Sequence, residues 1–526
     1  MLQDRLQRAL LVNGFAHEPG AECIGFIGDI SLEPQSEYRL TSSSLDTSSS
    51  WMPSRSASRD QRQLGRRRRR ARPFARVRLA FELAMSGLWR RSAILDLLIA
   101  CAAIGGMTLS VLHDLPVRTE SFAASDLKTL FASTWCFAHG INAYTFGNVQ
   151  SVFAAHGVVF PGSWFAHAPV YPPTTLALLV PLTALPMVPA VYSVVVVSAA
   201  IFGIAVTALL RSAAKDSIPL AGRAAIAVLC ACSPLFSFAL SMGNVSVVSS
   251  ALCILCFVRR KHGSGWFYGM LLAIAVLLKP HLAIWMLAGM LFLPERASRG
   301  VAIKAVAMAG SFAALVVAGL AASGNLLLEA RGFASILGAE TSSGSSMNAS
   351  SHEAIPICAQ ITSLHSLLGF WWKSSFAQTL LVVALLIALG AAVVWRTRTA
   401  RTEPELVLAI STWMTFGLLA TYHRAHDAIV LVILLPWLIQ AIGRAPRLWY
   451  PSAIILLYAA FNLSVSFPLV QAKIANGESS AFITFLLLRQ AALANAGLLL
   501  VMLVSMRSHF KPARATVPAQ LVLSAS

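Results

Sequence analysis

Charged residues are scarce in this chain. Only 12% of its 526 residues are Asp, Glu, Lys or Arg, whereas soluble globular chains carry about 25%. Hydrophobic residues make up 57%, and the mean hydropathy is +0.69. A soluble fold of this length could not cover so much apolar surface. Apolar runs near the ~20 residues needed to cross hydrocarbon recur from 93 to 506, so the composition indicates a membrane protein.

Acidic residues are the rarer of the two signs. There are 22 Asp and Glu against 41 Lys and Arg, which gives a net charge of +19. Such a balance also occurs in nucleic-acid-binding proteins. Here, however, the cations form short clusters between apolar runs, as in cytoplasmic loops under the positive-inside rule. The clusters lie at 66–70, 90–91, 259–261, 296–299, 396–401, 444–447 and 507–514. We therefore expect no nucleic-acid partner.

Several motifs of soluble enzymes are missing. No Gly-rich phosphate loop is present, which argues against ATP hydrolysis. The pairs Cys230/Cys232 and Cys253/Cys256 have tempting spacing, but neither has the second ligand pair that a zinc site requires. We expect these cysteines to act as small hydrophobic residues in helix packing. No internal repeat is visible.

The first 90 residues differ in composition from the remainder. They contain a Ser/Thr-rich stretch and then a basic one, with an arginine run at 66–70. No short apolar stretch with a cleavage site follows directly, so this is not a secretory signal. We expect residues 1–90 to form a disordered cytoplasmic tail that contacts anionic lipid, with Met85 as an alternative start. A transmembrane domain at 91–506 and a cytoplasmic tail at 507–526 complete the predicted organisation.

The apolar runs predict an all-α polytopic membrane protein with about 11–13 transmembrane helices. The expected spans are 92–112, 170–186, 188–210, 224–240, 245–258, 266–280, 281–294, 301–322, 376–395, 406–421, 427–443, 451–467 and 481–506. Loop charge places the termini inside and the segments 113–168, 279–281, 323–375, 422–427 and 468–480 outside. The parity of crossings between 113 and 223 stays open. Apolar spacing within 125–144 predicts an interfacial helix in the first outer loop.

Polar residues near a bilayer cost several kcal/mol unless they serve a purpose. The expected outer segments hold Asp126, Asn142, Tyr144, Tyr171, Asn244, Lys279, His281, His423, Arg424, His426 and Asp427. The charges of the loops assigned each segment to one side of the membrane, and these residues were chosen separately, by their side-chain chemistry. All of them nevertheless fall on the same side. This agreement predicts a site at the outer membrane surface.

Asp126 has two interpretations. It lies in the first turn of the expected helix, where a carboxylate can cap the free backbone N–H groups. It can also act as a general base that faces a cavity at the membrane surface. The residue pattern leaves both interpretations open.

The order of several short motifs resembles glycosyltransferase family 87, a family with the GT-C membrane architecture. The resemblance covers about 92–505. It rests on Asp126, then 140–144 (GINAY), 171–173 (YPP), 178–182 (LLVPL), Gly243-Asn244, Lys279-Pro280-His281, and finally His423, His426 and Asp427. One departure is Asn244, which stands where a Gly-Gln-x-Asn pattern would place Gln.

The resemblance implies a GT-C-like bundle and a hexosyltransferase that uses a polyprenyl-phosphate donor carrying mannose or a related sugar. It implies an envelope glycolipid or glycan as acceptor, transfer with inversion, Asp126 as general base, and no metal or cofactor. Cations must meet the charge that develops on the leaving phosphate. The candidates are Lys279, His281, His423 and Arg424, with Arg331 and Lys373 as lesser ones; Tyr144, Tyr171, Asn244, His426 and Asp427 are further candidates for substrate contact.

Other interpretations remain. Lys279 can simply extend its ammonium from a helix end towards water, and His423, His426 and Asp427 have the chemistry of a Zn²⁺ or Mn²⁺ site. At the level of function, the alternatives are a secondary transporter or lipid flippase, or a structural protein of the envelope. For the enzyme, we expect a multi-pass protein of the inner (plasma) membrane whose active site lies on the non-cytoplasmic face.

Overall fold

A computed structural model describes the part of the chain that carries the predicted membrane domain. The described residues are 93–113, 115, 117, 124–159, 170–215, 218–262, 265–341, 360–372, 376–444, 453–458 and 481–509. The predicted tails at 1–90 and 507–526 lie outside these residues, except for 507–509 at the end of the last helix. Lys373 also lies outside them.

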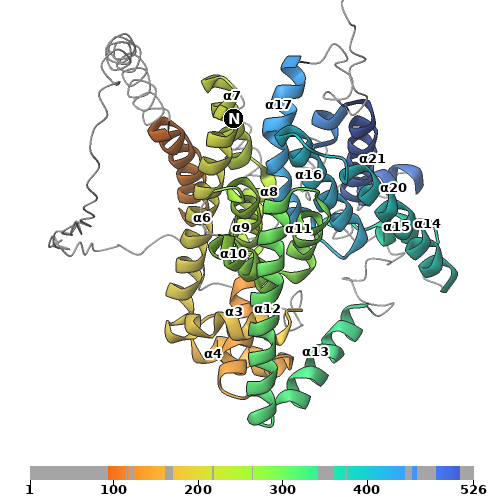
Figure 1. Ribbon diagram of the computed structural model, residues 1–526. Helices are drawn as coiled ribbons and strands as arrows, with labels where there is room; N and C mark the ends of the chain where they lie inside the picture. Colours follow the sequence, from red (N-terminus) through yellow and green to blue (C-terminus); the bar gives the residue numbers. More distant parts are fainter. Residues whose placement is uncertain are drawn as a thin grey trace, which may run out of the picture. The chain divides into compact units, whose positions relative to one another are not determined.

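The described residues are helical, and they contain no β-strand beyond an isolated bridge between Ile361 and Arg424. Among the described residues, five segments are long and apolar enough to cross a membrane: Ala93–His113, Met187–Ala213, Leu220–Ser241, Arg296–Ala322 and Phe376–Thr397. Shorter apolar helices accompany them. The prediction of an all-α polytopic membrane protein is therefore confirmed (Figure 1).

The elements follow in chain order after the helix Ala93–His113. The first set is α3 (Ser125–Ala138), α4 (Phe146–Ala155), α5 (Pro173–Leu179), η2 (Val180–Ala184), α6 (Met187–Lys215), α7 (Leu220–Ala231), α8 (Pro234–Ser241), α9 (Ser246–Arg259), α10 (Gly265–Leu278) and α11 (Pro280–Phe292). The second set is α12 (Arg296–Ala322), α13 (Leu326–Thr341), α14 (Leu364–Trp371), α15 (Phe376–Thr397), α16 (Glu403–Ala420), η4 (Ala425–Leu434), α17 (Leu435–Arg444), α20 (Ala481–Leu488) and α21 (Gln490–His509).

Several predicted spans are divided in the structure. The span 224–240 becomes α7 and α8, because Pro234 opens a new helix and the Ser233 hydroxyl accepts a hydrogen bond from the Leu235 N–H. The span 481–506 becomes α20 and α21, which meet at Arg489. Within the predicted span 451–467, the structure describes a helix at 453–458.

The segments that connect the predicted transmembrane spans also contain helices. The helix expected in the first outer loop is α3, and a second helix, α4, follows it. Most of α3 is buried against α4, α5, η2 and α6, including polar residues such as Lys128 and Ser133. In the segment 323–375 the structure adds α13 and α14.

The buried cysteines fill helix interfaces. Cys230, Cys253 and Cys256 are buried free thiols in α7 and α9, whereas Cys232 is exposed at the end of α7. The expected role in helix packing is therefore met by these three cysteines but not by Cys232.

Helices α9, α11 and α16 connect two polar ends of the molecule, and α11 contacts both of the others. At one end, Arg260 and Lys261 after α9 form ion pairs with Glu295 after α11 and with Glu403 at the start of α16. The opposite ends of the three helices therefore meet about 20 Å away, given 1.5 Å per residue. That second end holds the candidate site.

Gly417 allows α16 and α11 to approach closely. A Cβ atom added there would lie 2.2 Å from Trp285 Cγ. We expect Gly417→Ala to lower the free energy of unfolding by about 1–3 kcal/mol through overpacking. Gly310→Ala on α12 is the matched control, because nothing lies within 4 Å of its added Cβ. Thermal unfolding in detergent measures both variants, and equal melting temperatures would contradict this packing.

Candidate functional site

The first turn of α3 lies against the end of α8. The Ala124 N–H donates to Ser241 O (2.6 Å) and the Asp126 N–H donates to Met242 O (3.2 Å). Gly243 permits this approach, because its φ is +64° and a Cβ there would lie 2.6 Å from Leu127 Cβ. The turn that follows α8 therefore brings Asn244 beside Asp126.

The Asp126 carboxylate is not used as a helix cap. The N-cap of α3 is Ala124, with no side-chain cap hydrogen bond. Asp126 Oδ2 instead accepts a hydrogen bond of 2.6 Å from Asn244 Nδ2. The side chain is partly exposed, so a substrate hydroxyl can reach it.

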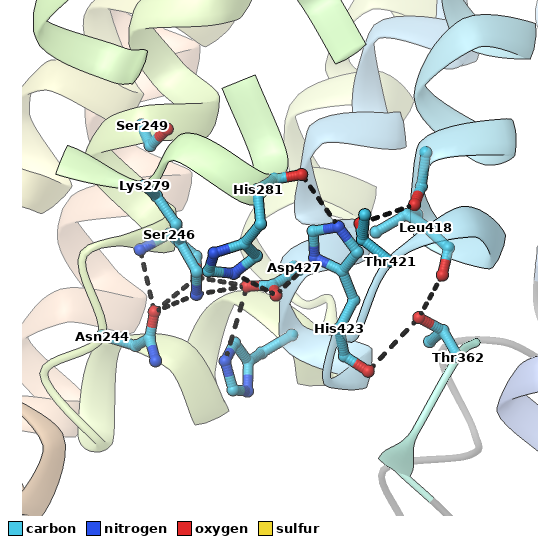
Figure 2. Close-up of polar contacts among 12 residues, drawn as sticks. Asn244, Ser246, Ser249, Lys279, His281, Thr362, Leu418, Thr421, His423 and Asp427 are labelled. Atoms are coloured by element: carbon cyan, nitrogen blue, oxygen red, sulfur yellow. Dashed lines mark hydrogen bonds and ion pairs between the residues drawn. The ribbon is translucent and has the colours of Figure 1, made fainter. Parts of the chain in front are cut away.

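Asn244 joins two parts of the site. While Nδ2 donates to Asp126, Oδ1 accepts from the Ser246 N–H (2.9 Å) and from Lys279 Nζ (2.9 Å). The neighbours fix the orientation of this amide, since its oxygen faces two donors and its nitrogen faces a carboxylate. A single amide therefore separates the Asp126 carboxylate from the Lys279 ammonium. Figure 2 shows the side of the amide that faces Lys279.

Lys279 owes its place to the proline that follows it. The residue before a proline is pushed out of the helical region, and Lys279 has φ −145° and ψ 78° between α10 and α11. Its side chain is buried, and Nζ donates to Asp427 Oδ1 at 2.5 Å and to the Ser246 hydroxyl. The alternative interpretation, in which Lys279 extends its ammonium towards water, therefore does not hold in the structure.

Several hydrogen-bond donors and charged groups surround the Asp427 carboxylate. Oδ1 contacts Lys279 and accepts from the Ser246 hydroxyl at 2.5 Å, and His426 Nε2 lies 3.5 Å away. Oδ2 contacts His423 Nδ1 at 2.9 Å, and His281 Nε2 lies 3.8 Å from it. Removing any one partner would leave a buried charge poorly compensated.

His423 fastens this carboxylate to two neighbouring segments. Its Nδ1 faces Asp427 Oδ2 and its Nε2 faces the carbonyl oxygen of His281 at 3.1 Å, so a neutral ring could donate to only one of them. The backbone N–H of Thr362 donates to the His423 carbonyl oxygen at 3.0 Å. Figure 2 shows Thr362 and His281 on either side of the His423 ring.

The predicted site residues divide into buried and accessible groups. Lys279, His423, His426 and Asp427 have exposed fractions between 0% and 3%. The side chain of His281 is 35% exposed, and Tyr171 and Arg424 are partly exposed.

Tyr144 and Arg424 link the site to its surroundings. The Tyr144 hydroxyl donates to the Tyr171 carbonyl oxygen at 2.7 Å. Both Asp126 and Asp427 stabilise the Arg424 cation, and Tyr422 forms a side-chain hydrogen bond with it. The structure therefore brings the ten main candidates together at this one end. The lesser candidate Arg331 lies on α13, outside these contacts, and Lys373 lies outside the described residues.

Ser246 is the residue that the sequence interpretation missed. Its hydroxyl and backbone N–H contact Asn244, Lys279 and Asp427. A signal was present, because Asn244 and Ser246 occupy the two polar positions of the Gly-Gln-x-Asn pattern. Polar residues therefore stand at both positions, although they are Asn and Ser where the pattern has Gln and Asn.

A metal ion has one candidate ligand set among the described residues. The ligand atoms of His281, His423 and Asp427 lie within 4.8 Å of one another, and such a set suits Zn²⁺ or Mn²⁺. However, Lys279 already compensates the Asp427 charge at 2.5 Å, and the second ring nitrogen of His423 faces a backbone carbonyl. Among the described residues, Lys279 and the His281 carbonyl therefore occupy two of the contacts that a metal ion in this ligand set would compete for.

Part of the chain is similar to a known protein family. Residues 170–421 match the model of glycosyltransferase family 87. The chain is thus similar to glycosyltransferase family 87 over slightly less than half of its length. No curated protein and no solved structure matches the chain.

The family 87 match contains only part of the site. Tyr171, Asn244, Ser246, Lys279 and His281 lie within the matched residues. Asp126 precedes the match, and the residues from His423 to Asp427 follow it. Hydrogen bonds connect the outlying residues to the matched ones, since Asp126 contacts Asn244 and Asp427 contacts Lys279.

Proposed function

We propose that this protein is a membrane glycosyltransferase that transfers a sugar, mannose in the first instance, from a polyprenyl-phosphate donor. The acceptor is an envelope glycolipid or glycan. The proposal is supported by the family 87 match and by the polar network that ends at Asp126.

The observation that carries the proposal is the amide of Asn244. It hydrogen-bonds the Asp126 carboxylate on one side and the Lys279 ammonium on the other. Glycosyl transfer with inversion needs a base near the acceptor oxygen and positive charge near the departing phosphate. In this scheme the anomeric carbon would lie beside the Asn244 amide, with the base at one end of the amide and the positive charge at the other.

Asp126 acts as the general base in this scheme. It takes the proton of the acceptor hydroxyl as the oxygen attacks the anomeric carbon of the donor. The new glycosidic C–O bond forms while the bond from that carbon to the phosphate oxygen breaks. The bonding electron pair leaves with the polyprenyl phosphate.

His281 and Arg424 are the accessible groups that would receive the leaving phosphate. Both are partly exposed, and both lie beside the buried Lys279 and Asp427. Lys279 would contribute its charge from behind this surface and hold Asn244 in place. His423 would act as a positioning residue, because it is buried and contacts Asp427 and the His281 carbonyl.

The prenyl chain of the donor requires contact with lipid, which apolar helices exposed on the bundle surface would provide. Exposed apolar residues occur along α12 and α15, including Leu315 and Ile387. We place the protein in the inner (plasma) membrane with the active site on the non-cytoplasmic face, because the cationic loops lie at the opposite ends of α9 and α11.

The direct test uses purified protein in detergent. We expect it to transfer mannose from radiolabelled polyprenyl-phosphate mannose to a component of a total polar lipid extract, and to keep this activity in excess EDTA. A transporter or flippase would yield no product without a sealed compartment. Absence of transfer under these conditions contradicts the proposed function, and loss of transfer in EDTA contradicts metal-independent chemistry.

A further inference from the structure

A cavity lies between the α3–α4 connection and α13. Its volume is about 450 Å³, within the range of about 300–1,000 Å³ that is usual for small-molecule sites. Its walls are Asn142, Tyr144, Thr145, Leu327, Leu328, Arg331, Gly332 and Ser335. None of the contacts between Asp126 and Asp427 described above involves these residues, apart from the link through Tyr144.

The wall formed by the α3–α4 connection is well ordered by hydrogen bonds. Asn142 Oδ1 accepts from the Tyr144 N–H at 2.9 Å, and the Asn142 carbonyl oxygen accepts from Asn148 Nδ2 at 3.0 Å. Gly332 lets α13 approach this wall, because a Cβ there would lie 2.9 Å from both Asn142 Oδ1 and Tyr144 Cδ2. The Tyr144 ring also contacts the Phe333 ring, with 5.6 Å between their centroids.

Hydrogen-bond donors dominate the polar side of the cavity. The Arg331 guanidinium forms no ion pair with any described residue. Asn142 Nδ2 donates no hydrogen bond to a described residue. The hydroxyls of Thr145 and Ser335 complete this side. A guanidinium with hydroxyl and amide neighbours suits a phosphate bonded to a polyhydroxylated group.

The carboxylate nearest in sequence to Arg331 does not neutralise it. Glu329 is buried, is absent from the cavity wall, and accepts a hydrogen bond from the Ala143 backbone. The apolar part of the wall, by contrast, is open, since Leu327 and Leu328 are 64% and 39% exposed. The cavity thus offers positive charge and donors next to exposed apolar surface, which is the pattern that the head group of an amphiphile requires.

Tyr144 connects this cavity to the reaction site. Its hydroxyl donates to the Tyr171 carbonyl oxygen, and burial together with the Glu329 carboxylate raises the pKa of Tyr144, so the hydroxyl stays protonated. The adjacent Ala143 carbonyl oxygen accepts from Ser133 Oγ at 2.8 Å. Ser133 lies about two helical turns after Asp126 on α3, or about 10 Å along the axis.

We propose that this cavity binds a phosphate-bearing carbohydrate head group of an amphiphilic acceptor. Arg331 contacts the phosphate, Asn142 and Ser335 contact hydroxyl groups, and Leu327 and Leu328 contact the apolar portion of the lipid. The assignment to the acceptor rests on the proposed function, and on the hydrogen bond that joins the cavity wall at Ala143 to Ser133 of α3, the helix that carries Asp126.

Binding without donor or catalysis tests the site itself. Glucose 1-phosphate, glucose and inorganic phosphate serve as probes in calorimetric titrations of the detergent-purified full chain. We expect glucose 1-phosphate to bind tightest, Arg331→Gln to weaken it about tenfold or more, and Arg331→Lys to weaken it less. Arg299→Gln, an exposed arginine at the start of α12, is the matched control and should bind as wild type.

Two results would overturn this assignment. One is equal binding of glucose 1-phosphate by wild type and Arg331→Gln, and the other is wild-type binding no tighter than that of glucose or inorganic phosphate. Transfer to the lipid extract separates this idea from the proposed function. If glucose 1-phosphate binding depends on Arg331 but the wild-type protein transfers no sugar, the proposed function is wrong and the binding site remains. If Arg331→Gln transfers sugar at the normal rate with an unchanged acceptor KM, the acceptor site is wrong and the proposed function remains.

Discussion

Replacing Asp126 by Asn is expected to lower sugar transfer by about 10²–10⁴-fold, the usual contribution of a general base. The substituted amide has the shape of the carboxylate, and its oxygen can still accept the hydrogen bond that Asn244 Nδ2 donates. The geometry of the site should therefore survive while the proton acceptor is lost. Initial rates of transfer from radiolabelled polyprenyl-phosphate mannose measure the effect, and donor binding by the same variant should be unchanged.

Glu329→Gln is the matched control for this substitution. Like Asp126, Glu329 is a carboxylate in the first turn of a helix. It is buried, accepts a hydrogen bond from the Ala143 backbone, and makes no contact with Asp126. Its transfer rate should stay near that of wild type. A fully active Asp126→Asn enzyme would remove this residue as the base, and an equally inactive Glu329→Gln enzyme would show that loss of charge in this region acts through folding.

The second large effect is expected at the ion pair between Lys279 and Asp427. Lys279→Met leaves the buried Asp427 carboxylate without its ammonium partner, and such a break costs about 3–5 kcal/mol. The double variant with Asp427→Asn should recover part of that stability, because neither buried charge remains. Transfer should stay lost in both variants, since Asn244 loses the ammonium that it contacts at 2.9 Å.

Unfolding of the purified protein, followed in detergent, measures the single and double variants. Lys261→Met is the control at the other end of the bundle, because Lys261 is 47% exposed in its pairs with Glu295 and Glu403. An exposed pair contributes about 0–1 kcal/mol, so this variant should unfold almost as wild type does. Similar losses from Lys279→Met and Lys261→Met would show that the buried pair has no special role.

Most of the helical segments, and the breaks at Lys279 and Gly243, could be predicted because their causes are local; the breaks at Pro234 and Arg489 were not predicted. Hydrophobic runs mark the helices, and Pro280 displaces Lys279 from helical geometry whatever the surrounding fold. Gly243 similarly ends α8 in a left-handed conformation that other residues rarely adopt. Loop charge placed the candidate residues at one end of the bundle, and their hydrogen bonds in the structure agree with that grouping.

The contacts within the site could not be predicted from these local causes. Asn244 and Asp126 are 118 residues apart, Lys279 and Asp427 are 148 apart, and Ser246 and Asp427 are 181 apart. No hydrophobic period or turn preference links residues over such distances. Asn244 consequently looked like a weakening departure from a family motif, although its amide joins the carboxylate to the ammonium.

The sequence by itself determined that this is a helical membrane protein, where most of its helices lie, and at which end of the bundle the polar residues gather. These features follow from hydrophobicity, proline and glycine, which act on neighbouring residues of the chain. Only the tertiary structure decided which polar atoms meet. That outcome depends on how α3, α9, α11 and η4 pack, which also buries Lys279 and His423 and leaves His281 accessible. The packing of α13 against the α3–α4 connection forms the cavity beside Arg331.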